Sequence, residues 1–330
     1  MVQRPSQDQR DPDAPLPSAP RLSGELERGT KAPGEAVVPP AIEALRRQAT
    51  TLVDLLGDDS PTVHEAVRDE LLRLGRPARA ALRRALDSPH ARRRGRSRAI
   101  LLELDRRDSV RRLLRHAARP RIDLEQALFL LGGLETPGLD SRPYELALDA
   151  MADEVARRIA QESEPLARAM VLTHYLGGEL GYLGSEVDYT HRDNIHLHRA
   201  IERKRGMPLT LCAIYLLVAR RAGLRAGALP LPGHVLLRIR DEGRSLIVDP
   251  FHGGRIRTRE DCLRYLADHS LAPRPEWFRE ASDRALFQRQ ALNLMNSEQM
   301  RGFSRRASDL HRIALVLGRP AERNAVGQSS

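Results

Sequence analysis

The most apolar stretch of the chain, from Met207 to Ala222, constrains the fold more than any other feature of the sequence. Pro208 lies near its start, where proline suits the first turn of a helix, and Gly223 follows its end, where glycine commonly stops one. The stretch is shorter than the ~20 apolar residues that cross a bilayer. It therefore predicts a strongly apolar helix inside a folded domain, and no membrane partner.

Two short strands are predicted after this helix, at Val235–Ile239 and Ser245–Val248. The charged turn Asp241-Glu242-Gly243 separates them, and a turn of this composition between apolar runs indicates a hairpin. A helix followed by antiparallel strands is typical of an α+β arrangement. We therefore expect an α+β fold in this part of the chain.

Helical patterns flank this part on both sides. Hydrophobic residues make up 41% of the chain and aromatic residues only 4%, so the core must be mainly aliphatic, a mixture that favours helices. Residues 1–40 and the tail from 318 to 330 are rich in proline or polar residues and are predicted to be disordered. Apolar residues recur at helical spacing after Ile42, within 123–161, in Glu260–Ala267 and from Trp277 to Leu317.

A weak internal repeat lies in the first helical region. Asp59-Ser60-Pro61 recurs as Asp87-Ser88-Pro89, and Asp or Ser before Pro is a signal that starts a helix. The first copy, LLGDDSPTVHEAVRDELLRLGRPARAALRRAL, resembles a HEAT-type helical repeat, whereas the second resembles it poorly. Because helical repeats need neighbours to bury their faces, we expect these two units to pack against the next domain.

The basic residues are almost all arginines, since Lys31 and Lys204 are the only lysines in a chain of net charge +10. Arginine suits bidentate contacts with phosphate, so nucleic acid is a candidate partner. No basic run with interleaved aromatic residues strengthens this interpretation. The Arg-dense stretch from Arg92 to Arg98 is more simply the solvated face of a helix.

Three features that occur in a fixed order suggest chemistry. An apolar helix begins at Pro208, His234 follows Pro232-Gly233 at the start of a strand, and Asp249 ends the next strand. In thiol hydrolases the nucleophile lies at a helix N-terminus, a histidine acts as its base, and a carboxylate orients that histidine. The order of helix, histidine and aspartate matches this plan.

These residues also carry a family resemblance. Tyr189, Asn194, the run RKRGMPLTLCAIYLLVARRAGL, then LPGHVLLRI and VDPF resemble the SirB branch of the transglutaminase-like superfamily over about 150 residues. The resemblance implies a papain-like core in which a helix packs on a small antiparallel sheet. It also implies motif positions at Asn194, Gly206, Pro208, Gly233 and Pro250, beside the catalytic positions of His234 and Asp249.

The chain departs from the catalytic members of this superfamily at the nucleophile. The cysteine that they carry soon after the glycine at the start of the helix falls here on Pro208, or within a residue or two of it. Cys212 lies one helical turn further on, either as a displaced nucleophile or, more simply, as a small core residue. Thr210 is expected to hydrogen-bond within the first turn.

The remaining candidates indicate no metal and no cofactor. His191, His196 and His198 lie close in sequence, but no carboxylate or cysteine at ligand spacing completes a site, so they are interpreted as solvated loop histidines. The only two cysteines, Cys212 and Cys262, form neither a disulfide framework nor a four-ligand zinc site, and Cys262 is most simply a core residue.

The expected organisation and function follow from these points. We expect a disordered tail (1–40), HEAT-like repeats (41–118), a SirB-type transglutaminase-like domain (119–270), C-terminal helices (271–317) and a second disordered tail (318–330). We expect a cytoplasmic, non-catalytic module that binds or regulates a protein partner, because the N-terminus lacks the apolar stretch of a signal peptide. The alternative is a thiol-dependent peptidase, amidase or acyl transferase that uses Cys212 with His234 and Asp249.

Overall fold

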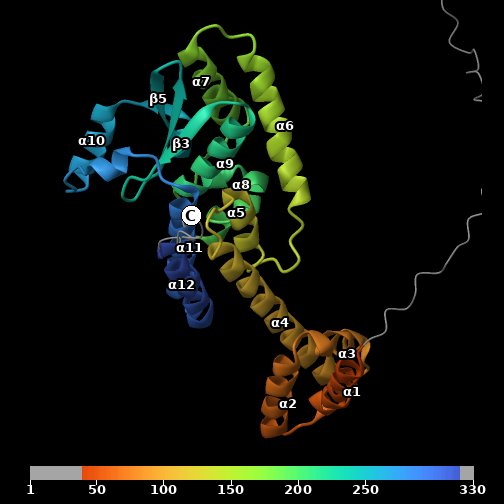
Figure 1. The fold of residues 1–330 in the computed structure, drawn as a ribbon. Coiled ribbons are helices and arrows are strands. Elements are labelled where there is room, and N and C mark those ends of the chain that lie inside the picture. Colours follow the sequence, from red (N-terminus) through yellow and green to blue (C-terminus); the bar gives the residue numbers. More distant parts are fainter. Residues whose placement is uncertain (1–38, 320–330) are drawn as a thin grey trace, which may run out of the picture. The chain divides into compact units, whose positions relative to one another are not determined.

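The computed structural model describes residues 39–319, so the segments predicted to be disordered lie almost entirely outside the described residues. The chain divides into the units Met1–Ala44 and Leu45–Ser330. Figure 1 shows the order of the elements. The helices before the sheet are α1 (Pro40–Asp54), α2 (Pro61–Leu74), α3 (Arg79–Arg84), α4 (Ala91–Ala117), α5 (Leu124–Gly132), α6 (Arg142–Ile159), α7 (Pro165–Thr173) and α8 (Leu197–Arg203).

The two copies of the sequence repeat begin their helices differently. Pro61 is the first residue of α2, and the Ser60 hydroxyl accepts a hydrogen bond from the backbone N–H of Val63 at 3.4 Å, as predicted for a capped start. In the second copy α4 begins only at Ala91, two residues after Pro89. There the Ser88 hydroxyl accepts from the N–H of His90 at 3.3 Å, so it fixes the turn before the helix instead of capping it.

The Arg-dense stretch is not simply a solvated face. Arg93 donates to the Asp54 carbonyl at 2.9 Å, and Arg96 donates to the carbonyls of Leu56 (2.9 Å) and Asp58 (2.6 Å). These carbonyls lie where α1 and the following turn end, a place where backbone carbonyls commonly need hydrogen-bond donors from outside the helix. The arginines therefore cap a neighbouring helix end, which the sequence interpretation missed.

The sheet contains four antiparallel strands in the order β3 (Arg225–Leu229), β4 (Leu236–Asp241), β5 (Arg244–Asp249) and β6 (Arg255–Arg257). The predicted hairpin is β4–β5, and Glu242 and Gly243 at its turn both have positive φ, as tight hairpin turns require. A separate parallel pair joins β1 (Leu183–Gly184) to β2 (Arg205–Gly206). The α+β class predicted from the sequence is confirmed.

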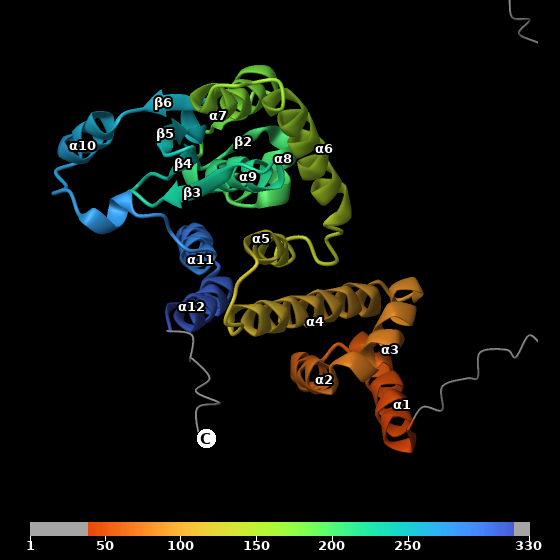
Figure 2. The same cartoon turned by 45° about the horizontal axis from the view of Figure 1, so that its top comes forward.

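Helix α9 (Pro208–Arg221) is the predicted apolar helix, and its residues from Pro208 to Ala219 are buried. Side chains alternate across a strand, so neighbours in β4 face opposite sides. Leu237 belongs to the cluster around α9, whereas Leu236 belongs to the cluster around α10 (Arg259–Asp268). Figure 2 accordingly shows α9 and α10 on opposite sides of the sheet.

The C-terminal part is interrupted where continuous helix was predicted. A short turn at Pro275–Phe278 precedes α11 (Asp283–Met300), and α12 (Ser304–Gly318) follows it. The Ser282 hydroxyl accepts from the Ala285 N–H at 3.2 Å and starts α11, while Gly302, with φ +79°, separates the two helices. Buried side chains of α11 and α12 share the hydrophobic cluster of α9. None of the helices in the described part of the chain combines the length and apolar character needed to span a membrane.

Candidate functional site

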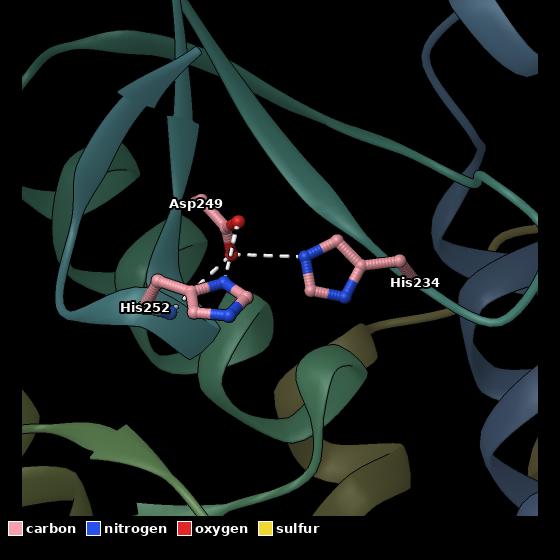
Figure 3. Close-up of side chains that lie close together, drawn as sticks. All are labelled: His234, Asp249 and His252. Carbon is pink, nitrogen blue, oxygen red and sulfur yellow. Dashed lines mark hydrogen bonds and ion pairs between the residues drawn. The ribbon is translucent and has the colours of Figure 1, made fainter. Parts of the chain in front are cut away.

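The centre of the site is a hydrogen-bonded pair formed by His234 and Asp249. His234 ends the loop before β4, and Asp249 is the last residue of β5. Their side chains meet with His234 Nε2 2.9 Å from Asp249 Oδ1 (Figure 3). Asp249 is buried and His234 nearly so. The structure thus brings together two of the three residues that were predicted as catalytic positions.

Asp249 has two further partners. The Nδ1 atom of His252 lies 2.8 Å from Asp249 Oδ2, and Arg257 donates to the same oxygen from Nε at 3.1 Å and Nη2 at 3.0 Å. Burial by itself would raise the pKa of Asp249, but the hydrogen bond and charge of His234 and the charge of His252 hold that pKa far below its usual range. Asp249 is therefore an ionised carboxylate.

This ionised carboxylate sets the tautomers of both histidines. A carboxylate only accepts hydrogen bonds, so His234 Nε2 and His252 Nδ1 must both carry the donated proton. The other nitrogen of each ring points away from Asp249 in Figure 3. His252 was not among the predicted residues. The sequence feature that could have identified it is its position three residues after Asp249, at the end of the turn Pro250–His252.

Two tyrosines hold the loop that carries His234. Tyr265 donates its hydroxyl to the Pro232 carbonyl at 3.0 Å, and Tyr189 donates to the Gly233 carbonyl at 3.4 Å. Gly233 has φ +71°, and a Cβ there would lie only 2.8 Å from the Tyr265 hydroxyl oxygen. Glycine is therefore favoured at this motif position for two reasons: the backbone has a positive φ, and there is little room for a side chain.

A buried arginine from α11 completes this support. Arg289 Nη2 donates to the Leu231 carbonyl at 2.8 Å and to the His234 carbonyl at 3.2 Å. Burial lowers the pKa of Arg289, and its hydrogen bonds go to backbone carbonyls and not to a carboxylate. Its backbone acceptors replace an acidic partner, and they fix both ends of the segment from Leu231 to His234. Sequence reasoning missed this residue because it lies far along the chain.

The start of α9 places Pro208, and not a thiol, beside the pair. Pro208 lines the same cavity as His234 and Asp249. Cys212 is 1% exposed, is not among the residues that line this cavity, and points its Sγ at the Leu236 carbonyl, 3.4 Å away. Burial raises the pKa of the Cys212 thiol far above its usual value, so the thiolate is disfavoured.

Thr210 does not bond within the first turn of its helix, as the sequence analysis expected. Its hydroxyl donates to the Ile195 carbonyl at 3.1 Å and accepts from Gln290 Nε2 at 2.8 Å. The expectation was wrong because a chain segment outside the helix offers a better acceptor. Thr210 therefore connects α9 to the segment before α8 and to α11, and it is fully buried.

The cavity at the site measures about 440 Å³. Tyr189, Phe251 and Tyr265 supply aromatic walls, and the exposed side chain of Arg264 lies at the edge. Cys262 also lines it but is 2% exposed, and burial raises the pKa of its thiol, in line with a core role.

A second cavity of about 450 Å³ lies between α5 and α6. Two of its acidic residues already pair with Arg221, which contacts Glu125 at 2.6 Å and Asp149 at 2.8 Å. The cavity beside His234 is therefore the better candidate site, because its imidazoles keep free ring nitrogens.

The other motif residues have structural roles near the site. Asn194 donates from Nδ2 to the Asp188 carbonyl at 2.8 Å and accepts from Arg203 at 3.0 Å, which fixes the turn before α8. A Cβ on Gly206 would lie 3.3 Å from the Ala200 Cβ. Pro250 opens the short turn that brings His252 back to Asp249.

The interpretation of the histidine group as solvated is wrong for two of its members. His196 and His198 are 1% and 2% exposed, and only His191 remains partly exposed. Burial lowers the pKa of His196 to about 3 and also lowers that of His198. Both histidines lie at the start of α8, whose inner face packs into the core. Packing of this helix therefore buries them although their side chains are polar.

Comparison with known proteins agrees with this geometry. Residues 142–291 match the family described as transglutaminase-like superfamily, so the chain contains a domain of that superfamily. The predicted SirB assignment is confirmed as well. Protein SirB1 of Salmonella typhimurium is 27% identical over 139 residues, which cover 42% of this chain and 50% of that protein. The chain thus contains a transglutaminase-like domain of the SirB type.

Other curated proteins also match part of the chain. A UPF0162 protein of Xylella fastidiosa is 29% identical over 167 residues, which cover 51% of this chain and 57% of the relative. Human F-box only protein 21 is 27% identical over 143 residues, or 41% of this chain and 22% of that protein. The chain thus matches little more than half of the bacterial relatives and about a fifth of the human one. No solved structure matches the chain.

Proposed function

We propose that this chain is a cytoplasmic, non-catalytic transglutaminase-like module that binds a protein partner through the cavity beside His234. The observation that carries the proposal is Pro208, which lines the cavity at the start of α9 and offers no nucleophile. Although this position offers no nucleophile, the chain has both the His234–Asp249 pair and the cavity beside it. Such a site can retain recognition without turnover.

The shape and chemistry of the cavity support a polypeptide ligand. Three aromatic side chains line it, and aromatic residues supply much of the binding energy at protein interfaces. Charged groups, including Arg264 and Asp268, surround the apolar part, as at the rim of an interface. We further propose that the helices at 41–118 act as HEAT-like repeats that extend the surface offered to the partner.

The thiol alternative is less well supported by the contacts of Cys212. A general base must come within hydrogen-bond reach of its nucleophile, whereas the Cys212 sulfur faces the Leu236 carbonyl in the core. An enzyme of this class would need Cys212 to leave that position. An electrophilic thiol probe at neutral pH tests this directly, and His234-dependent labelling of Cys212 would contradict the non-catalytic proposal.

Partner capture with matched variants tests the binding role. Arg264→Glu reverses an exposed charge at the cavity, and Arg312→Glu reverses a comparably exposed charge on α12, outside it. We expect a partner that is retained by the full chain to be lost with Arg264→Glu and kept with Arg312→Glu. Equal retention by both variants would place the binding surface elsewhere.

A further inference from the structure

The residues around Asp249 form a set of potential metal ligands. His234, Asp249 and His252 each offer one donor atom, and these atoms all lie within 4.8 Å of one another. They come from a loop, a strand end and the turn after it, and their side chains converge in Figure 3. Two imidazoles with one carboxylate is a donor set that suits zinc and neighbouring first-row ions.

The site is open on one side. All three residues line the cavity of about 440 Å³, so water or a ligand group could complete a coordination shell. Asp249 is already ionised, and imidazoles are metal ligands in their neutral form. If the ion takes His234 Nε2 and His252 Nδ1, the protons move to the ring nitrogens that point away from Asp249.

The geometry requires a rearrangement, because the hydrogen-bonded donor atoms must move apart and donor atoms up to 4.8 Å from one another must come closer. The imidazole nitrogens lie 2.9 Å and 2.8 Å from the Asp249 oxygens, as in hydrogen bonds. Donors around a tetrahedral zinc ion lie about 3.3 Å apart, given metal–ligand bonds of about 2.0–2.1 Å. Rotation of His252, whose side chain is 43% exposed, provides this difference most easily.

Arg257 occupies the position of a competing cation. Its Nη2 lies 3.0 Å from Asp249 Oδ2 and 3.3 Å from His252 Nδ1. The positive charge of the Arg257 guanidinium balances the negative charge of the Asp249 carboxylate, and it would repel an incoming divalent ion. Arg257 lies on β6, a three-residue strand at the end of the sheet order, and its side chain is partly exposed. It can therefore turn outward when an ion takes its place.

We infer that His234, Asp249 and His252 bind a divalent first-row transition ion such as Zn²⁺, and that Arg257 competes with the ion for the same carboxylate. This site goes beyond the binding role proposed above. A partner can bind without an ion, and an ion can bind without the partner, so each idea can fail alone.

Titration of the full chain with Zn²⁺ by calorimetry, and with Co²⁺ by visible absorption, tests the inference. We expect one tight site, with affinity that falls at least about tenfold in His252→Ala, which removes a ligand. Arg257→Gln should bind Zn²⁺ about tenfold more tightly, because the competing charge is gone. His311→Ala removes an exposed histidine of α12 and should leave the affinity unchanged.

Three results would contradict the inference or part of it. If His252→Ala and His311→Ala bind Zn²⁺ as the unchanged chain does, or if no binding occurs, the cluster is not a metal site. If Arg257→Gln binds no more tightly, the competition is refuted. Circular dichroism of each variant shows whether it is folded, and Arg257→Gln and His252→Ala both change partly exposed side chains, so they are expected to fold.

Discussion

At the scale of single residues, His196 and His198 show how packing overrides polarity. Their rings lie 5.6 Å apart in the core, and neither nitrogen of His196 has a hydrogen-bond partner among the described residues. A neutral imidazole without partners costs less to bury than an imidazolium, which explains the lowered pKa. The two histidines are therefore neutral in the folded protein, and acid conditions that favour their protonation destabilise the fold.

The stability of the protein should fall in mild acid because of His196. Burial lowers its pKa from the usual 6.5 to about 3, so the unfolded chain binds the proton first as pH falls. Above about pH 6.5 the histidine is neutral in both states and carries no penalty, whereas between pH 6.5 and about 3 the free energy of unfolding falls by up to about 1.4 kcal/mol per pH unit. Denaturant unfolding at several pH values measures this slope.

His196→Leu provides the control for this prediction. Leucine fills the site without a titrating group and leaves no ring nitrogen unpaired, so we expect little loss of stability near pH 7 and a shallower slope in acid. His311→Leu, on the exposed side of α12, should keep the original slope. If His196→Leu retains that slope, the acid sensitivity arises elsewhere.

At the scale of elements, the start of α9 decides whether the site can hold a thiol. Pro208 is the first residue of the helix, where its missing N–H has no helical acceptor in any case. The position also lines the cavity with His234. A helix N-terminus and a nearby histidine both favour a thiolate, so the element keeps the environment of a nucleophile without the nucleophile.

Pro208→Cys should therefore produce a reactive thiol. We expect iodoacetamide to label it at least about tenfold faster than Cys212 and Cys262 at neutral pH, because the new thiol would have a lowered pKa. Mass spectrometry of the labelled peptides measures each rate. The further change His234→Ala should slow the labelling of Cys at this position.

Leu209→Cys is the matched comparison, since Leu209 is the next residue of α9 and is buried like Pro208, but it does not line the cavity. Its thiol should react slowly. Equal rates for the Pro208→Cys and Leu209→Cys thiols would show that the helix start does not activate a nucleophile.

The sequence predicted these elements unevenly, for physical reasons. The apolar period of α9 and the turn at Glu242–Gly243 are local signals, and both elements occur where expected. Strands β3 and β6 carry mainly small or charged residues, and they form because β4 and β5 offer edges with which they pair. Local patterns do not show such pairing in advance.

The candidate site was predictable only in part for the same reason. His234 and Asp249 stand in an ordered motif, so their meeting was expected from the sequence. His252 depends on a three-residue turn, and Arg289 reaches the loop from a helix 55 residues further along. Contacts between residues so far apart in the sequence depend on the packing of the whole domain, and no local sequence pattern predicts them.

At the scale of the whole molecule, the C-terminal helices are part of the site's support. Phe287, Ala291 and Leu294 of α11 are buried in the same cluster as α9. Arg289 of the same helix fixes the carbonyls of Leu231 and His234. Residues of a helix that begins only at Asp283 therefore determine how rigidly the His234 imidazole is held.

Arg289→Met tests this long-range support, because methionine preserves the apolar stem of the side chain but donates no hydrogen bond. Two carbonyls would lose their buried donor, so we expect a loss of about 1–3 kcal/mol in the free energy of unfolding. We also expect shifted NMR signals from the His234 ring, since its loop is released at both ends.

Arg284→Met is the comparison: Arg284 lies on the same helix and donates to the carbonyls of Ala117 (3.1 Å) and Leu317 (3.4 Å), away from His234. It should cost similar stability and leave the His234 signals in place. If both variants leave those signals unchanged, the loop is held by its tyrosines alone, and α11 contributes stability without positioning the site.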